Sequence, residues 1–545
     1  MRQIAAGAAD AAVRRTNTLE AVEALKLGGQ LAQDTAVKLQ EAYGFLRRLI
    51  DALRVMRGNA RDLTVPPAGS REFAHLSRRL YYDSPESLAE AIDVRHALRA
   101  RALGRLSGIS SPRRALAVLH MAGCRRWERA RGAAMSEQRW AWLRAQTPVL
   151  REYVYMNTGW SGPLSIPIVE AMHRRLAMEL EHGPTTRLVM EDRMQMDGRL
   201  RELAARLLGA DAEEISITGN TTAGMNIVLN GLDLGGGDRI VTTSVEHSSG
   251  MVPAYYLRER RGVDLTIVPM AATDAPAAIL ERLAGALGDG ARLIILSEIS
   301  YSTGQLLPLA EIVEAAHRAG ARVLVDGAQT AGQVPIDVRA TGVDYYAIPS
   351  HKWLCGPDGL GMLYVRSDLI TALEPAAMSG RAAASYDLEG QFEAQRERIT
   401  KFELTTVSGA LIAGTIAAIE QHLESGPQAV FDRVRELARY AERRFDGVEG
   451  VVVTSPRSED ARSGLFCFRV EGEEAARVSA YLQREAKVVC RAVREYDAVR
   501  LSLHVFNSEA DIERVAEAVE RAIAEGIPED IVVGVVAEAR ADAQT

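Results

Sequence analysis

Seven short apolar segments, rich in β-branched residues, recur from residue 214 onward and constrain the fold more than any other feature of the chain. Each has the length of a strand that is buried on both faces. Amphipathic helical stretches such as LAEIVEAAHRAGA lie between them. Strands that alternate with helices form a mainly parallel sheet covered by helices, so we expect an α/β fold. The segments are EISIT (214–218), RIVTTSV (239–245), LTIVPM (265–270), RLIILSEIS (292–300), RVLVDGAQ (322–329), YYAIPS (345–350) and GMLYV (361–365).

The first part of the chain has a different pattern. Apolar residues recur at helical spacing from about 18 to 104, which predicts an all-α helical bundle over 1–104, and a basic linker follows over 105–134. Residues 1–134 contain 23 Lys and Arg against 13 Asp and Glu, whereas the remainder contains 42 against 59. This asymmetry indicates two separate units. A nucleic-acid-binding arm would also be basic, but the arginines alternate with leucines at helical spacing, which favours a solvated helical face and no nucleic-acid partner.

Length and composition narrow the class of protein. A chain of 545 residues is long enough for two or three domains, and 47% hydrophobic with 25% charged residues is typical of globular proteins. The longest apolar runs are shorter than the roughly 20 residues of a membrane span, and the N-terminus lacks the apolar core of a secretory signal. The four cysteines (Cys124, Cys355, Cys467 and Cys490) form no CxxC pair. We therefore expect a cytoplasmic protein without a membrane partner, a disulfide framework or a metal site.

Ligands of parallel sheets bind beyond the carboxyl ends of the strands, so the residues there are candidates. In ITGNTTAGMN a strand ends at Thr218, and Thr221 and Thr222 open a helix whose free N–H groups suit a phosphate. An ordinary N-cap by Asn220 or Thr221 is the alternative. In VEHSSG, His247 follows a strand, where a lone histidine is more often a hydrogen-bonded structural group than part of a site.

Two charged residues follow the later strands. Asp326 follows three apolar residues and precedes a glycine turn, so its carboxylate is expected to be desolvated and to need a cationic partner, or else to be a capping residue. Lys352 stands in IPSHKWLCGPDGLG, at the end of an apolar run. It could extend its amine to solvent, but a desolvated lysine has a lowered pKa and can form a Schiff base with a carbonyl.

These motifs together resemble the class V aminotransferase family, which includes cysteine desulfurases, selenocysteine lyases and isopenicillin N epimerase-like proteins. The resemblance implies pyridoxal phosphate (PLP) fold type I over 135–525, with a large domain at about 165–390 and a small domain at about 391–525 plus 135–164, followed by a tail at 526–545. The bundle over 1–104 weakly resembles the C-terminal helical region of nucleotidyltransferases related to the PII-uridylyltransferases. The family match lies in YMNTGWSGP, GNTTAGMN, VEHSSGMVPAYYL, VDGAQTAGQVPIDV, SHKWLCGPDGLGMLYV, KFELTT and RLSLHVFN.

The resemblance also implies roles around the cofactor ring. Lys352 would hold PLP as a Schiff base and then move the substrate α-proton. Asp326 would pair with the ring nitrogen, His247 would stack on the ring face, and Gln329 would bond the side of the ring hydroxyl.

Further roles concern the phosphate, the partner subunit and the substrate. Thr406 would reach the cofactor of a partner subunit, which implies a homodimer with shared active sites. Arg500 would bind the carboxylate of a small amino-acid substrate, and Asn157 would also contact the substrate. The phosphate would be bound by Thr221, Thr222, Ser350 and His351.

The chain departs from the desulfurase pattern. Desulfurases carry a nucleophilic cysteine on a mobile loop before the substrate-binding arginine, but Arg491 lies only nine positions before Arg500 and leaves little room for that loop. We interpret Cys490 and Cys355 as packing residues, which disfavours chemistry through a protein persulfide. Gly250, Tyr301 and Pro349 also differ from the usual family residues and resemble the epimerase-like branch.

We therefore predict a PLP-dependent enzyme that acts on a small amino acid, most simply as an aminotransferase. A cysteine desulfurase-like C–S lyase or an amino-acid epimerase is the alternative within enzymes. An inactive PLP-fold binding or regulatory protein is the alternative outside them, and the joint presence of Lys352, Asp326, His247 and Arg500 argues against it. A nicotinamide enzyme is disfavoured because no GxGxxG follows a strand and opens a helix.

Overall fold

The structure is a computed structural model, and it describes residues 70–79, 84, 86, 88, 137–288 and 290–533. The chain divides into two compact units, Met1–Arg129 and Ala130–Thr545. In the first unit the structure describes one helix, α4 (Arg71–Arg79), within the stretch that is predicted to be helical. The rest of the predicted bundle, the basic linker over 105–134 and the end of the tail lie outside the described residues. The bundle and its resemblance to nucleotidyltransferases stay predictions.

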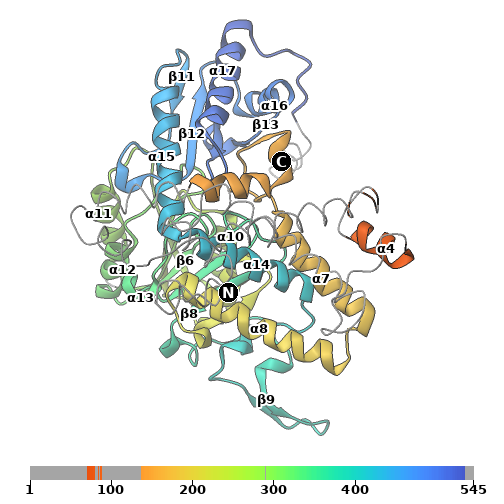
Figure 1. The fold of residues 1–545 in the computed structure, drawn as a ribbon. Helices are drawn as coiled ribbons and strands as arrows, with labels where there is room; N and C mark the ends of the chain where they lie inside the picture. The colour runs from red at the N-terminus through yellow and green to blue at the C-terminus, as the bar shows by residue number, and fades with distance from the viewer. Residues whose placement is uncertain are drawn as a thin grey trace, which may run out of the picture. The chain divides into compact units, whose positions relative to one another are not determined.

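A seven-stranded sheet forms the centre of the second unit (Figure 1). Its order is β2-β8-β7-β6-β5-β3-β4, and β8 is antiparallel to both of its neighbours while the other pairs are parallel. Each strand overlaps one of the seven predicted segments, with β4 and β5 beginning one residue earlier, so the α/β class with a mainly parallel sheet is confirmed. The strands are β2 (Ile215–Thr218), β3 (Arg239–Thr243), β4 (Asp264–Val268), β5 (Ala291–Ser297), β6 (Arg322–Asp326), β7 (Tyr345–Pro349) and β8 (Gly361–Val365).

Both faces of this sheet are buried, because successive strand residues enter opposite hydrophobic clusters. Ile240 and Leu293 pack with α9 (Thr221–Gly231) and α10 (Ser248–Arg261). Val241 and Ile294 belong to the cluster on the other face. The helices of that second cluster are α8 (Arg187–Leu208), α11 (Pro276–Leu287), α12 (Leu309–Arg318), α13 (Val338–Thr341) and α14 (Gly409–Ser425).

A smaller antiparallel sheet lies toward the C-terminus, in the order β11-β12-β15-β14. Three phenylalanines form the centre of its core, with Phe445 4.7 Å and 5.3 Å from the rings of Phe468 and Phe466. Its strands and helices are β11 (Val451–Val453), β12 (Leu465–Val470), β14 (Arg491–Val493), β15 (Ala498–Ser502), α15 (Pro427–Phe445), α16 (Ala475–Ala486) and α17 (Glu509–Glu525).

We propose a domain boundary that differs from the sequence-based one. Ile399, Phe402 and the apolar face of α14 pack in the two clusters that flank the large sheet. The small domain therefore begins with α15 rather than at residue 391. In this proposal the segment 137–164 stays with the small domain, because it contacts residues of that domain. In that segment β1 (Val154–Tyr155) pairs with β13 (Val488–Val489), and Arg144 forms an ion pair with Asp511 at 2.5 Å.

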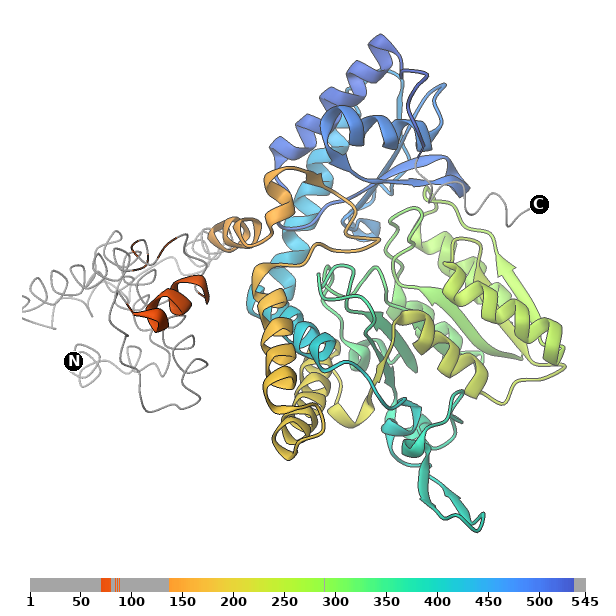
Figure 2. The same ribbon diagram turned by 90° about the vertical axis from the view of Figure 1, so that its right-hand side faces the viewer.

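Two further features complete the second unit. The helix α7 (Ile166–His182) packs against α14, and the strands β9 (Ala383–Tyr386) and β10 (Phe392–Ala394) form a hairpin that projects away from the large sheet (Figure 2). Among the residues that the structure describes, no helix is both long and apolar enough to cross a membrane.

Candidate functional site

A cavity of about 1250 Å³ opens at the carboxyl ends of the parallel strands, and both domains contribute to its wall. The large domain contributes the start of α9, the start of α10 and the turns after β6 and β7. The small domain contributes α16 and β15. The predicted site residues in this wall are Thr221, Thr222, His247, Gln329, His351, Lys352 and Arg500.

The start of α9 combines the two interpretations of its sequence. Asn220 is the N-cap, since its Oδ1 accepts from the Ala223 N–H at 2.8 Å. The neighbouring Thr221 is buried, and its hydroxyl has no hydrogen-bond partner within the described part of the chain. A buried unpaired hydroxyl in a cavity wall is costly unless a ligand bonds it. The helix start thus offers N–H groups and a hydroxyl to an anion.

His247, Ser249 and Asp326 form one hydrogen-bonded chain. Asp326 ends β6 and is 4% exposed. Its Oδ1 accepts from the Ala328 N–H at 2.9 Å, and its Oδ2 accepts from Ser249 Oγ at 2.9 Å. His247 caps α10, with its Nδ1 2.7 Å from Ser249 Oγ. Sequence reasoning missed Ser249, although two consecutive serines after a strand-end histidine could have suggested a bridging hydroxyl.

Lys352 lies three residues past the end of β7 in the cavity wall. Burial lowers the pKa of its amine to about 8, and the positive charges of Arg500 and Arg491 act in the same direction, while Asp326 opposes them. Roughly a tenth of the amine is therefore neutral and nucleophilic at pH 7, far more than for a lysine with its ordinary pKa. Burial and the adjacent Lys352 also lower the pKa of His351.

Ser350 does not reach the cavity wall. It is fully buried, and its hydroxyl donates to the carbonyl of Pro357. Its main chain bonds Leu360 and Gly356, so it holds the turn that carries Lys352. The role at the phosphate that the resemblance implies for Ser350 thus has no support from its position.

Gln329 lies in the wall with both ends of its amide engaged. Its Nε2 donates to the Gly159 carbonyl at 2.9 Å, and its Oε1 accepts from the Trp353 Nε1–H at 2.9 Å. Gln329 therefore ties the turn around Lys352 to the segment that precedes α7.

Arg500 is fully buried on β15. Its Nη1 donates to the Tyr301 carbonyl at 2.6 Å, whereas Nε and Nη2 have no hydrogen-bond partner among the described residues. Burial lowers the pKa of Arg500 to about 10, and the nearby Arg491 adds to this. A buried guanidinium with unpaired N–H groups is suited to a carboxylate ligand. The backbone of Asn157 forms an isolated parallel β-bridge with that of Ser502, and Asn157 is not part of the cavity wall.

Several wall residues were not assigned a role from the sequence. Tyr301 packs edge-on against His247, with ring centroids 5.2 Å apart, and its hydroxyl donates to Glu495 at 3.1 Å. Arg491 lies over the ring of Trp160 at 4.4 Å. These contacts join segments far apart in the chain, and no local pattern predicts them. Thr406 is exposed and outside the wall, with a φ of 62°.

The described cysteines are poor nucleophiles. Burial raises the pKa of Cys355 to about 12 and those of Cys467 and Cys490 to about 11. Cys490 lies in the cavity wall, with its Sγ 3.5 Å from Ser479 Oγ. Each of these cysteines is thus a protonated thiol at neutral pH. Cys124 lies outside the described residues.

Comparisons with known proteins give consistent results. The model of the family described as aminotransferase class-V matches residues 186–515. A cysteine desulfurase from Enterobacter sp. is 31% identical over 401 residues, which cover 70% of this chain and 97% of the relative. A probable cysteine desulfurase from Methanothermobacter thermautotrophicus is 28% identical over 395 residues, covering 69% of this chain and 96% of the relative.

Solved structures are similar over the same region. The cystine C–S lyase C-DES, in complex with its reaction product cysteine persulfide, is 30% identical with a TM-score of 0.65 and covers 69% of this chain and 99% of its own. A mutant of C-DES, with glycine linked covalently to its PLP cofactor, has the same identity and TM-score and covers 69% of this chain and 98% of its own.

Proposed function

Because the chain belongs to the class V aminotransferase family, we propose that it is a PLP-dependent C–S lyase that acts on cysteine or an S-substituted cysteine such as cystine. The predicted family, fold type I and cofactor are confirmed. The relatives are desulfurases and a cystine lyase, which favours the C–S lyase alternative over the aminotransferase that the sequence placed first.

One observation carries the proposal: Lys352, Thr221 and Arg500 open on the same cavity, each suited to a different part of a PLP-bound amino acid. The unpaired hydroxyl of Thr221 and the Nδ1 of His351, which also has no hydrogen-bond partner among the described residues, fit an anionic phosphate. The desolvated carboxylate of Asp326 fits a cationic ring nitrogen. PLP would supply an aldehyde for covalent attachment and a ring that accepts the negative charge developing at the substrate Cα.

The residues of the chain would position the substrate and move its protons. Arg500 would bind the α-carboxylate through its unpaired N–H groups, which orients the Cα–H bond. The Lys352 amine, with its pKa of about 8, would take the Cα proton. Loss of that proton lets the Cβ–S bond break with the electron pair leaving on sulfur, which then takes up a proton. With one water molecule, the three-carbon fragment ends as pyruvate and ammonium.

The cysteines support a lyase without a protein nucleophile. A desulfurase that forms a protein persulfide needs a thiolate, and burial keeps Cys355, Cys467 and Cys490 protonated. The sulfur would therefore leave with its own substituent, as a thiol, hydrogen sulfide or a persulfide.

Product analysis tests this proposal. The purified protein would be incubated separately with L-cystine, L-cysteine and L-alanine, each with and without a keto-acid acceptor. We expect pyruvate, ammonia and released sulfur from a sulfur substrate without any acceptor, and the same products from a Cys490→Ala variant. Products that form only with a keto-acid acceptor would identify an aminotransferase, and D-isomers would identify an epimerase. If the unmodified protein released sulfur and Cys490→Ala did not, Cys490 would be a nucleophile and the proposal of a lyase without one would be contradicted.

We also propose a homodimer in which Thr406 reaches the cofactor of the partner subunit. Thr406 is exposed in a non-glycine left-handed conformation, which costs free energy and therefore indicates a position held by its surroundings. Large apolar side chains are exposed nearby in sequence or on α7 and α8: Leu176, Leu180, Leu188, Met190, Met194 and Leu404. Such exposure is typical of an interface. The cytoplasmic location stays a prediction from the sequence.

A further inference from the structure

The hydroxyl of Ser249 lies between His247 and Asp326, the two residues for which the family resemblance implies contact with the cofactor ring. It is 2.7 Å from His247 Nδ1 and 2.9 Å from Asp326 Oδ2. The side chain is 4% exposed, so water does not compete for these bonds. Ser249 is in the cavity wall together with His247. The hydrogen-bonded series of His247, Ser249 and Asp326 therefore connects the cavity with the end of β6.

The hydroxyl has a single proton, and this restricts the hydrogens along the chain. When that proton is donated to Asp326, His247 Nδ1 must carry a proton and donate it to Oγ. When Asp326 is protonated and donates to Oγ, the hydroxyl donates to a bare Nδ1. The backbone N–H of Ser249, 3.2 Å from Nδ1, supports this second form because it can only donate. In both forms the three side chains stay hydrogen-bonded to one another, which a relay requires, and only the first form loses the bond from the Ser249 N–H.

We propose that Ser249 is a positioning residue that links His247 and Asp326 in a proton relay between the cavity and the carboxylate at the cofactor nitrogen. This inference rests on the proposed function. In one direction Nε2 of His247 takes a proton from the cavity, Nδ1 passes its proton to Oγ, and Oγ passes its proton to Oδ2 of Asp326. The reverse sequence returns a proton to the cavity. The transfer involves no oxidation or reduction and breaks no bonds other than those to the moving protons. Its net result is one proton moved from the cavity to Asp326.

The surrounding charged groups keep this relay sensitive to pH. Glu246 faces Asp326 from the end of β3 and accepts from Thr243 and from the N–H and hydroxyl of Ser297, and burial raises its pKa to about 7. Lys352 faces Asp326 from the turn after β7, and Tyr301 packs on His247. Glu298 lies buried next to Ser297, and burial raises its pKa to about 7 as well. Asp326 thus shares its surroundings with buried acids, where the transfer of one proton alters the charge balance.

The experiment compares Ser249→Ala with Ser248→Ala, whose side chain is the exposed neighbour on the same turn. Each protein would be loaded with PLP, and the cofactor absorption would be recorded from pH 5 to 10. We expect Ser249→Ala to shift the titration midpoint by about half a pH unit or more, because the hydroxyl no longer couples the two groups. Ser248→Ala should titrate like the unmodified protein. Equal titration curves in all three proteins would overturn the relay.

A second measurement covers a Ser249→Ala protein that fails to fold. Ser249→Cys keeps a weak donor of similar size, and its midpoint should move in the same direction by a smaller amount. In parallel, ring nitrogen-15 signals of His247, assigned with His247→Gln, should report a changed tautomer balance in the Ser249 variant even without cofactor. An unchanged balance would also overturn the inference. If the unmodified protein bound no PLP, the proposed function would fail, whereas the tautomer measurement would still judge the relay.

Discussion

At the scale of single residues, the chemistry of the site comes from burial. Lys352 acquires a pKa of about 8 because the folded chain removes water from its amine. The buried guanidinium of Arg500 donates one hydrogen bond to the Tyr301 carbonyl, while its Nε and Nη2 have no hydrogen-bond partner among the described residues. Both residues are thus held in unfavourable surroundings that a ligand would relieve.

Lys352→Ala tests the covalent attachment. The unmodified protein treated with PLP and then with borohydride should retain the cofactor on the peptide that contains Lys352, as measured by mass spectrometry. Lys352→Ala should retain none, because no other amine has the same position. Lys487→Ala is the matched control, since that lysine also lines the cavity but its amine is paired with Glu152, so this variant should be labelled normally. A reducible linkage in Lys352→Ala would refute the assignment.

Arg500→Lys tests the carboxylate contact. Lysine keeps the charge but loses the bidentate geometry, so we expect the KM for amino-acid substrates to rise with a loss of about 2 kcal/mol in binding, or roughly 30-fold. Steady-state kinetics measure this, with Arg318→Lys, an exposed helix residue paired with Glu314, as the control. An unchanged KM in Arg500→Lys would remove this residue from the substrate site.

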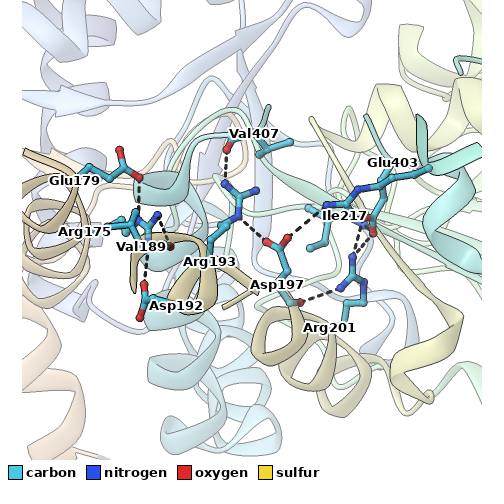
Figure 3. A network of polar contacts seen from close by, with 11 residues as sticks. Arg175, Glu179, Val189, Asp192, Arg193, Asp197, Arg201, Ile217, Glu403 and Val407 are labelled. Atoms are coloured by element: carbon cyan, nitrogen blue, oxygen red, sulfur yellow. Dashed lines mark hydrogen bonds and ion pairs between the residues drawn. The ribbon is translucent and has the colours of Figure 1, made fainter. Parts of the chain in front are cut away.

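At the scale of elements, a buried ionic network holds the turn before α14. Figure 3 shows Arg201 on α8 bound to Glu403, whose carboxylate also accepts from the Ile217 N–H on β2 at 3.0 Å. Arg381 completes the shell around Glu403, and Arg193 bonds the Val407 carbonyl at 2.5 Å. These contacts fix the residues on both sides of Thr406, which accounts for its left-handed conformation without a glycine.

Glu403→Gln should destabilise the fold by about 2 kcal/mol, because it removes the buried carboxylate that pairs with the half-buried Arg201 and Arg381. The free energy of unfolding in urea measures the effect. Glu191→Gln breaks the exposed pair with Arg187, whose side chain is 90% exposed, and should cost less than about 0.5 kcal/mol. Similar losses in the two variants would show that the network does not behave as a buried one.

Two buried histidines next to the turn after Lys352 should make the domain pair sensitive to acid. Burial lowers the pKa of His422 and of His504 to about 4, and His504 bonds the Trp353 carbonyl through Nε2 at 3.0 Å. The unfolded chain binds protons below about pH 6.5, and the folded chain does not until about pH 4. The contribution of each histidine to stability should therefore fall by about 1.4 kcal/mol per pH unit as the pH drops through this window, while the raised pKa values of the buried Glu246 and Glu298 act in the opposite direction.

Urea unfolding at pH 6.5, 5.5 and 4.5 measures this dependence. Relative to the unmodified protein, His422→Leu should become more stable as the pH falls across the window, by about one proton's contribution. His173→Leu, on the exposed side of α7, should lose stability with pH as the unmodified protein does. A pH dependence in His422→Leu equal to that of the unmodified protein would contradict the assignment.

At the scale of the whole molecule, the family match and the site both lie within Ala130–Thr545. A chain that begins at Met135 should therefore fold and bind PLP with the same absorption spectrum as the full chain. Fluorescence titration with PLP would compare the two affinities, and we expect them to agree within about a factor of two. Loss of cofactor binding on truncation would place part of the site upstream.

Much of the fold and part of the site could be predicted from the chain because their signals are local. Each strand of the large sheet is a short apolar run, and Asp326 and Lys352 directly follow such runs. Long-range contacts left no such signal. The link from Ser249 to Asp326 spans 77 positions, and the Arg500 contact with Tyr301 spans 199. The position of Ser350 depended on Pro357 across a turn, and the domain boundary depended on where α14 packs.

The spacing of apolar residues and the position of glycine and proline breaks are enough to predict strands, helices and strand ends. Backbone geometry makes these elements depend on residues that are neighbours in the sequence. Which side chains share a cavity, which hydroxyl turns inward and which guanidinium lacks a partner depend on the order of strands in the sheet and on the docking of the second domain. Those arrangements lower the free energy only when distant segments pack together, and each side chain takes its protonation and partners from that packing.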